Sequence, residues 1–227
     1  GAVGDSLLIA PTGGGKTLAG FLPSLVDLRD GAARRGAVHT LYVSPLKALT
    51  ADIGRNLARP IADLDLPVRV EDRTGDTGAT QRRRQRVDPP EILLTTPESL
   101  ALMLSYPEAP RIFGGLRRVV LDELHALAES KRGDQLMLCL ARLRHLAPRL
   151  RVTGLSATVE DPAALAGFMA GAAPVGIIQA DPGPDPDIAM LPTATPAPWA
   201  GGGGHYAIPE VLDAVRQART TIIFINT

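Results

Sequence analysis

A glycine-rich segment directly after a short apolar run constrains this chain more than any other feature. Residues 10–17 read Ala-Pro-Thr-Gly-Gly-Gly-Lys-Thr, and Leu7–Ala10 has the apolar character of a buried strand. A helical pattern starts near Lys16. Glycines in such a strand-to-helix turn let backbone amides converge on an anion at the positive end of the helix. The segment therefore predicts a phosphate-binding loop, although Ala10 stands where the general pattern has glycine.

The side chains of this loop suit a nucleoside triphosphate. Lys16 would place its charge on the β- and γ-phosphates, and the Thr17 hydroxyl would bind Mg²⁺. The expected ligands are ATP and Mg²⁺. The residues expected to contact the nucleotide are Pro11, Thr12, Gly13, Gly14, Gly15, Lys16 and Thr17.

Two adjacent carboxylates follow another apolar strand, predicted at Val119–Asp122. Asp122 would hold Mg²⁺, directly or through water, and Glu123 would orient and deprotonate the attacking water. Together with Lys16, these acids form the predicted catalytic set, because each motif supplies a ligand that the other lacks. His125 is equally consistent with a polar residue at the strand end and with a nucleotide sensor.

A third strand, predicted at Val152–Ser156, also ends in small hydroxyl residues. Ser156 and Thr158, together with His125, could couple the phosphate-bound state to a neighbouring domain through hydrogen bonds. The alternative is that these hydroxyls are ordinary helix caps, since a helix is expected from Pro162 after Asp161.

Short apolar runs alternate with amphipathic stretches, which is typical of βα units around a mostly parallel sheet. The predicted fold class is therefore α/β. The expected strands are Leu7–Ala10, Thr40–Val43, Val68–Val70, Ile92–Thr95, Val119–Asp122, Val152–Ser156 and Val175–Ile178. The expected helices start near Lys16, Lys47, Gly78, Pro97, Gln135 and Pro162.

The composition changes after Gln179. Residues 180–204 hold many prolines and end in four glycines, which predicts a linker. A helix is expected at Ile208–Ala218 and a buried strand at Thr221–Ile225. One helix and one strand cannot bury their apolar faces alone, so residues 205–227 are predicted to start a second domain that is truncated. The alternative is that this strand joins the edge of the first sheet.

The net charge is zero, yet the charges are unevenly distributed. Residues 1–160 carry 22 basic and 18 acidic side chains, whereas residues 161–227 carry 2 and 6, so the basic excess lies with the motifs. The arginine-rich run Gln81–Arg86 is expected to be a solvated helix face, with nucleic-acid contact as the alternative. Cys139 is expected to be a core residue, since it cannot form a disulfide within the chain.

Five motifs stand in order along the chain: Ala10–Thr17, Ser44–Leu49, Thr95–Ser99, Asp122–His125 and Ser156–Thr158. Their order and spelling resemble motifs I, Ia, Ib, II and III of superfamily-two helicases. The tracts Arg73–Thr77, Leu93–Leu104 and Ser130–Gly133 resemble the Lhr family of large-helicase-related DNA helicases, and the bacterial ligase-associated DEXH-box branch fits best.

This resemblance implies a RecA-like P-loop NTPase domain over residues 1–179 and the start of a second RecA-like domain at 205–227. It implies an ATP-dependent DNA helicase or translocase, moving 3′ to 5′ on single-stranded DNA, with a function in DNA repair and an association with a DNA ligase. RNA as the strand and a non-catalytic binding fragment remain alternatives. The residues that would face the sugar-phosphate backbone are Ser44, Lys47, Thr95, Thr96 and Ser99.

The resemblance also indicates what the chain lacks. The upstream glutamine motif that reads adenine has no counterpart here, so the sequence does not indicate selectivity for adenine. The late motifs that supply arginine fingers are also missing, so this chain alone is expected to hydrolyse ATP poorly. No apolar run is long enough to span a bilayer and the first residues lack signal-peptide features, so a bacterial cytoplasmic protein is expected.

Overall fold

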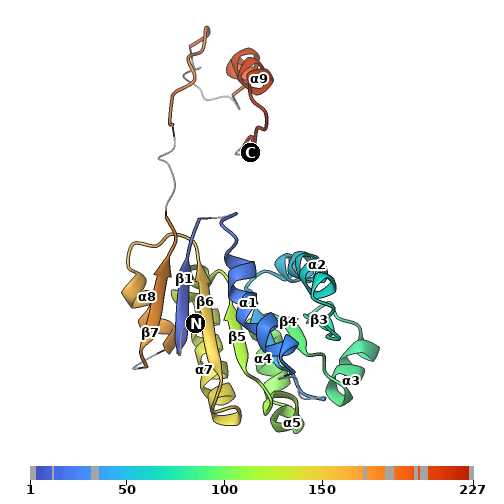
Figure 1. Cartoon of the computed structure of the whole chain (residues 1–227). Helices are drawn as coiled ribbons and strands as arrows, with labels where there is room; N and C mark the ends of the chain where they lie inside the picture. The colour runs from blue at the N-terminus through green and yellow to red at the C-terminus, as the bar shows by residue number, and fades with distance from the viewer. Residues whose placement is uncertain are drawn as a thin grey trace. The chain divides into compact units, whose positions relative to one another are not determined.

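A computed structural model of the chain describes residues 4–11, 13–31, 36–170, 173–181, 187–196, 199 and 204–224. The chain divides into two compact units, residues 1–182 and 183–227, which are described separately. The first unit is built on a parallel sheet with helices on both faces (Figure 1).

The strands are β1 (Asp5–Ile9), β2 (Thr40–Val43), β3 (Val70–Arg73), β4 (Ile92–Thr95), β5 (Arg118–Leu121), β6 (Arg151–Ser156) and β7 (Val175–Gln179). The helices of the first unit are α1 (Lys16–Arg29), α2 (Lys47–Asp63), α3 (Ala79–Val87), α4 (Pro97–Leu104), α5 (Ala109–Phe113), α6 (Leu124–Ala128), α7 (Lys131–Leu146) and α8 (Pro162–Ala170). The sheet order is β3-β4-β2-β5-β6-β1-β7, and each of these pairings is parallel.

Two buried apolar clusters lie on opposite faces of the sheet, because successive side chains of a strand point to opposite sides. In β5, Val119 and Leu121 join the cluster packed by α4 to α8, whereas Val120 joins the cluster packed by α1 and α2. Continuous apolar strands are the expected sequence of a parallel sheet covered on both faces. The predicted α/β class is confirmed.

The functional motifs gather at one edge of this sheet. β6 lies between β1 and β5, so the loops after these three strands are neighbours. Parallel strands have their carboxyl ends at the same edge, which is where open α/β sheets bind ligands. Parallel pairing thus brings Lys16, Asp122 and Ser156 to one edge from distant parts of the sequence.

Several predicted boundaries were wrong for identifiable reasons. The strand expected at Val68–Val70 is β3, Val70–Arg73. Charged residues are tolerated in β3 because it is an edge strand of the sheet. Helix α7 starts at Lys131 rather than near Gln135, since the Ser130 hydroxyl accepts a hydrogen bond from the Gly133 amide and caps it. The short helices α5 and α6 were not predicted.

The arginine-rich run in α3 is not simply a solvated face. Arg82 donates to the backbone oxygens of Thr77 (2.6 Å) and Gly75, and so holds the loop before the helix. The guanidinium of Arg86 lies 3.8 Å from the ring centroid of Tyr106. Arg84 pairs with Glu71, and among the described residues only Arg83 of the four arginines makes no hydrogen bond, ion pair or ring contact. The run largely stabilises its own surroundings.

The second unit contains a short 3₁₀ turn, η1 (His205–Ala207), and the helix α9 (Ile208–Gln217). The strand expected at Thr221–Ile225 was wrong for the described part, because residues 221–224 are exposed and adopt no strand. No described residue pairs with them as a neighbouring strand, and a β-strand needs such a partner. Residues 225–227 lie outside the described residues.

None of the described helices is both long and apolar enough to cross a membrane. Cys139 is buried in α7, as expected of a core residue, and burial raises the pKa of its thiol.

Candidate functional site

The glycine-rich loop joins β1 to α1 in a conformation that requires glycine at two positions. Gly13 and Gly15 have φ of 83° and 75°, a region that other residues rarely adopt. No atom lies within 4 Å of the position of a Cβ at either glycine, so both face open space. Gly15 is also the N-cap of α1 and provides no side-chain cap. The first amides of α1 are therefore available to an anion. Thr12 lies outside the described residues.

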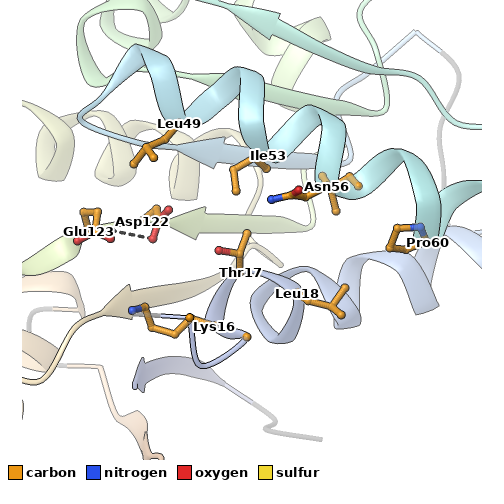
Figure 2. A pocket seen from close by; sticks show the side chains of 12 residues that line it. Lys16, Thr17, Leu18, Leu49, Ile53, Asn56, Pro60, Asp122 and Glu123 are labelled. Atoms are coloured by element: carbon orange, nitrogen blue, oxygen red, sulfur yellow. Dashed lines mark hydrogen bonds between the residues drawn. The ribbon is translucent and has the colours of Figure 1, made fainter. Parts of the chain in front are cut away.

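A cavity of about 430 Å³ opens above this loop (Figure 2). Lys16 and Thr17 line it from the start of α1, and Asp122 and Glu123 line it from the end of β5. The predicted catalytic and metal-binding residues thus share one cavity. Its remaining wall is lined by Gly13, Gly15, Leu18, Leu49, Ile53, Asn56, Leu57 and Pro60.

The Lys16 ammonium is held by the loop itself. Its Nζ donates to the carbonyl oxygens of Ala10 at 2.9 Å and Pro11 at 3.5 Å. These are neutral acceptors, so the positive charge has no carboxylate partner among the described residues. A phosphate oxygen would bind such a cation more strongly than a carbonyl does.

Asp122 is nearly buried, with 5% of its surface exposed, yet it lines the cavity. One carboxylate oxygen, Oδ1, accepts a hydrogen bond from the Glu123 amide at 2.9 Å. The other, Oδ2, accepts a short hydrogen bond from the Tyr42 hydroxyl. Burial raises the pKa of Tyr42 and the charge of Asp122 raises it further, so the hydroxyl keeps its proton and acts as a donor.

Glu123 has φ of 49° and ψ of 42°, a left-handed conformation that is uncommon for a residue other than glycine. Such backbone strain costs on the order of 1–3 kcal/mol and clusters at functional sites. The strained turn separates the end of β5 from α6 and leaves the Glu123 side chain partly exposed on the cavity wall.

His125 connects the acidic motif to the end of β6. Its Nε2 lies 3.3 Å from Glu123 Oε2, and its Nδ1 lies 3.1 Å from the Ser156 hydroxyl. The Ala157 amide also points to Nδ1, at 3.4 Å. Glu123, His125 and Ser156 therefore form one chain of contacts, whereas the Thr158 side chain is exposed. Ser156 does not cap the helix after Asp161. That cap is Asp161 itself, whose carboxylate accepts from the Ala164 amide.

The residues expected to face a nucleic acid are distributed between the interior and the surface. Ser44 and Thr95 have no exposed surface. The Thr95 hydroxyl donates to the Arg73 carbonyl at 2.6 Å, and Ser44 accepts from the Leu46 amide at 3.3 Å. These two hydroxyls serve the fold in this structure.

Lys47, Thr96 and Ser99 lie where helices start. The Lys47 ammonium pairs with Asp76 at 3.0 Å, and both side chains are largely exposed. Thr96 is the N-cap of α4 and accepts from the Ser99 amide at 3.4 Å. α2 and α4 follow the neighbouring strands β2 and β4, so both helix starts lie at the edge that also carries the cavity.

These observations fit the expected nucleotide and metal. The loop offers open space over Gly13 and Gly15, uncapped helix amides and a lysine that contacts only neutral oxygens. Thr17 and Asp122, a hydroxyl and a carboxylate on the same cavity, are hard oxygen donors of the kind that Mg²⁺ accepts together with substrate phosphates.

Two parts of the site were missed by sequence reasoning. Tyr42 was assigned only to a strand, because the pairing of β2 with β5 that aims it at Asp122 is not visible in one sequence. The α2 wall was also missed, although Leu49, Ile53 and Leu57 recur at helical spacing and could have been recognised as one face.

Comparisons with known proteins agree with this geometry. Residues 2–165 match the family model for DEAD/DEAH box helicases. A Lhr helicase and probable uracil glycosylase of Mycolicibacterium smegmatis is 39% identical over 98% of this chain, which spans 16% of that protein. A Lhr helicase/uracil glycosylase of Escherichia coli is also 39% identical over 98% of the chain, 17% of its own length.

A solved structure gives the same result. The Mycobacterium smegmatis helicase Lhr bound to ssDNA and AMP-PNP superimposes with a TM-score of 0.75 and 38% identity, over 96% of this chain and 29% of that one. The chain thus spans under a fifth of the length of the first two relatives. A family model that covers residues 2–165 shows that the chain belongs to the DEAD/DEAH box helicases, and among them it is similar to the Lhr helicases over nearly its whole length.

Proposed function

We propose that this chain forms the ATP-binding part of a DNA helicase or translocase that uses ATP hydrolysis to move along single-stranded DNA. The observation that carries the proposal is the shared cavity, where the phosphate loop and the acid pair of β5 face one another. The similarity to a Lhr helicase solved with ssDNA and AMP-PNP supports DNA and ATP as the ligands. Movement from 3′ to 5′ and a function in DNA repair belong to the same proposal.

Within the cavity, each residue has a task that follows from its position. Lys16 and the first amides of α1 bind the phosphates, with Gly13 and Gly15 giving the backbone access to them. Thr17 and Asp122 would hold Mg²⁺, which supplies charge to the phosphates when bound. Glu123 accepts a proton from the water that attacks the γ-phosphate, and its left-handed turn leaves the partly exposed carboxylate on the cavity wall.

The contacts of His125 support a coupling function. A change in Glu123 on hydrolysis would pass through the imidazole to Ser156 at the end of β6. The starts of α2 and α4 are proposed to bind the sugar-phosphate backbone, through Lys47, Ser99 and helix amides. Such contacts do not read bases, so translocation without sequence preference is expected.

The substitution Glu123→Gln in the full-length protein tests the proposal. It should retain ATP binding, because Lys16 and the loop are unchanged, and should lose DNA-stimulated hydrolysis by about 100-fold or more. Undiminished turnover would reject the assignment of Glu123.

A comparison of strands tests the substrate. ATPase stimulation by DNA and RNA of equal length distinguishes a DNA motor from an RNA motor, since contacts to the RNA 2′-hydroxyl would favour RNA. Stronger stimulation by RNA would reject DNA as the track. ATP binding without hydrolysis at any concentration of either strand would instead support a non-catalytic binding protein.

A further inference from the structure

Tyr42 belongs to none of the five sequence motifs, yet its hydroxyl donates a hydrogen bond directly to Asp122, the acid that is proposed to hold Mg²⁺. Tyr42 in β2 pairs in register with Val120 in β5, and Asp122 lies two residues beyond Val120. Side chains two residues apart in a strand point to the same face of the sheet. Tyr42 therefore lies on the face that also carries Asp122, and its length brings the hydroxyl to Oδ2.

The ring of Tyr42 is held firmly in this position. It is fully buried and stacks on Phe21, with ring centroids 5.5 Å apart and an interplanar angle of 24°. Phe21 lies in α1, the helix that starts with Lys16 and Thr17. The wall behind the tyrosine is thus part of the element that carries the phosphate loop, so the donor and the proposed Mg²⁺ ligands are fixed to one another by packing.

The Asp122 carboxylate is consequently fixed at both oxygens. Oδ2 accepts from Tyr42, and Oδ1 accepts from the Glu123 amide. A carboxylate has about four acceptor positions, so two remain for a metal or its water. Without Tyr42, Oδ2 would lose its donor and the carboxylate could turn about its bond to Cβ.

We propose that Tyr42 is a positioning residue that fixes the Asp122 carboxylate for Mg²⁺, acting from β2 through its hydroxyl. This inference rests on the proposed ATPase function of the same cavity. Residues that hydrogen-bond to a metal-binding carboxylate hold that carboxylate in position. Removing such a partner typically lowers metal affinity or activity by roughly 10- to 100-fold. Tyr42 is not among the residues that line the cavity, so its effect should appear in the metal dependence.

The test is Tyr42→Phe in the full-length protein, which retains the ring and its stacking on Phe21. The measurement is AMP-PNP binding as a function of Mg²⁺ concentration. The variant should bind AMP-PNP like the wild type without metal, and should need roughly 10- to 100-fold more Mg²⁺ for half of the metal-dependent gain in affinity. The Mg²⁺ concentration for half-maximal ATPase should rise in parallel. An unchanged Mg²⁺ requirement would overturn the inference.

Two further variants separate the possible failures. Tyr106→Phe is the matched control, because it removes a hydroxyl that bonds Arg73 at 3.3 Å, and it should leave the Mg²⁺ requirement unchanged. Asp122→Asn tests the underlying function. If it does not alter the Mg²⁺ requirement, the metal site itself is wrongly assigned. If it does while Tyr42→Phe does not, only the positioning by Tyr42 is rejected.

A second variant, Phe21→Leu, covers the case in which Tyr42→Phe does not fold. Phe21→Leu keeps the hydroxyl but loosens the ring that it belongs to. A folded Phe21→Leu protein should show a smaller rise in the Mg²⁺ requirement than removal of the hydroxyl would cause. An unchanged requirement in that protein would count against the inference.

Discussion

The residues around the cavity and the residues proposed to face DNA lie at the same edge of the sheet but differ in what their side chains already contact. Lys16 binds only neutral carbonyls, and Glu123 stands in a strained turn on the cavity wall. By contrast, Ser44 and Thr95 are fully buried and bonded within the fold, and Lys47 is paired with Asp76. In the nucleotide region, the fold leaves charged side chains without an opposite charge or partly exposed on the cavity wall, where they can bind a ligand. The second region offers mainly helix starts and one exposed cation.

The largest expected effect is at Lys16, whose charge has no carboxylate partner among the described residues, in contrast to that of Lys47. Lys16→Ala should lower ATP hydrolysis on the order of 100- to 1,000-fold, since it removes a charge that only the nucleotide would neutralise. Steady-state ATPase and nucleotide-binding measurements check it. Retention of more than a tenth of wild-type turnover would contradict the picture of an open cation site.

A smaller effect is expected at His125, which joins the cavity to β6. His125→Ala should leave ATP binding unchanged and weaken the stimulation of hydrolysis by DNA by about tenfold, within the usual range for coupling between sites. The ratio of ATPase rates with and without DNA measures the effect. Exposed Thr158→Ala is the control. Equal loss in both variants would mean that the contact chain through His125 is not the coupling route.

Thr95 tests whether the buried hydroxyls of the second region serve the fold. Thr95→Val keeps the shape but removes the bond to the Arg73 carbonyl, and should lower the free energy of unfolding by about 1–3 kcal/mol. Denaturant unfolding measures the loss. DNA affinity under native conditions should not change. A loss of DNA affinity in a fully folded Thr95→Val protein would show that this hydroxyl contributes to DNA binding.

The smallest effect is expected at the Lys47–Asp76 pair, because exposed ion pairs contribute little. Lys47→Gln should reduce the slope of log DNA affinity against log salt by about 1, as for one lost phosphate contact. Asp76→Asn frees the same ammonium and should not weaken DNA binding. Salt titrations of DNA affinity distinguish the two variants. An unchanged slope in Lys47→Gln would exclude Lys47 as a phosphate contact.

Much of the fold was readable from the sequence because its strands are short apolar runs bounded by loops. β2 and β4 were predicted with their observed bounds, and α1, α2, α4 and α8 start where expected. β3 was misplaced because a strand at an edge depends on its neighbour more than on its own composition. The strand expected at 221–225 was wrong for residues 221–224, since no described residue pairs with them. The narrower placement in the ligase-associated branch and the second domain remain predictions.

The sequence by itself determined the chemistry of the phosphate loop and the acid pair, since glycine, lysine, threonine and paired carboxylates in strand-end positions have few other uses. Only the tertiary structure decided which groups share a cavity and which are buried and hydrogen-bonded within the fold. The parallel order β5-β6-β1 brings Asp122 to Lys16, and the pairing of β2 with β5 aims Tyr42 at Asp122. These contacts join residues far apart in the chain, and strand order is set by packing of the whole sheet rather than by any local pattern.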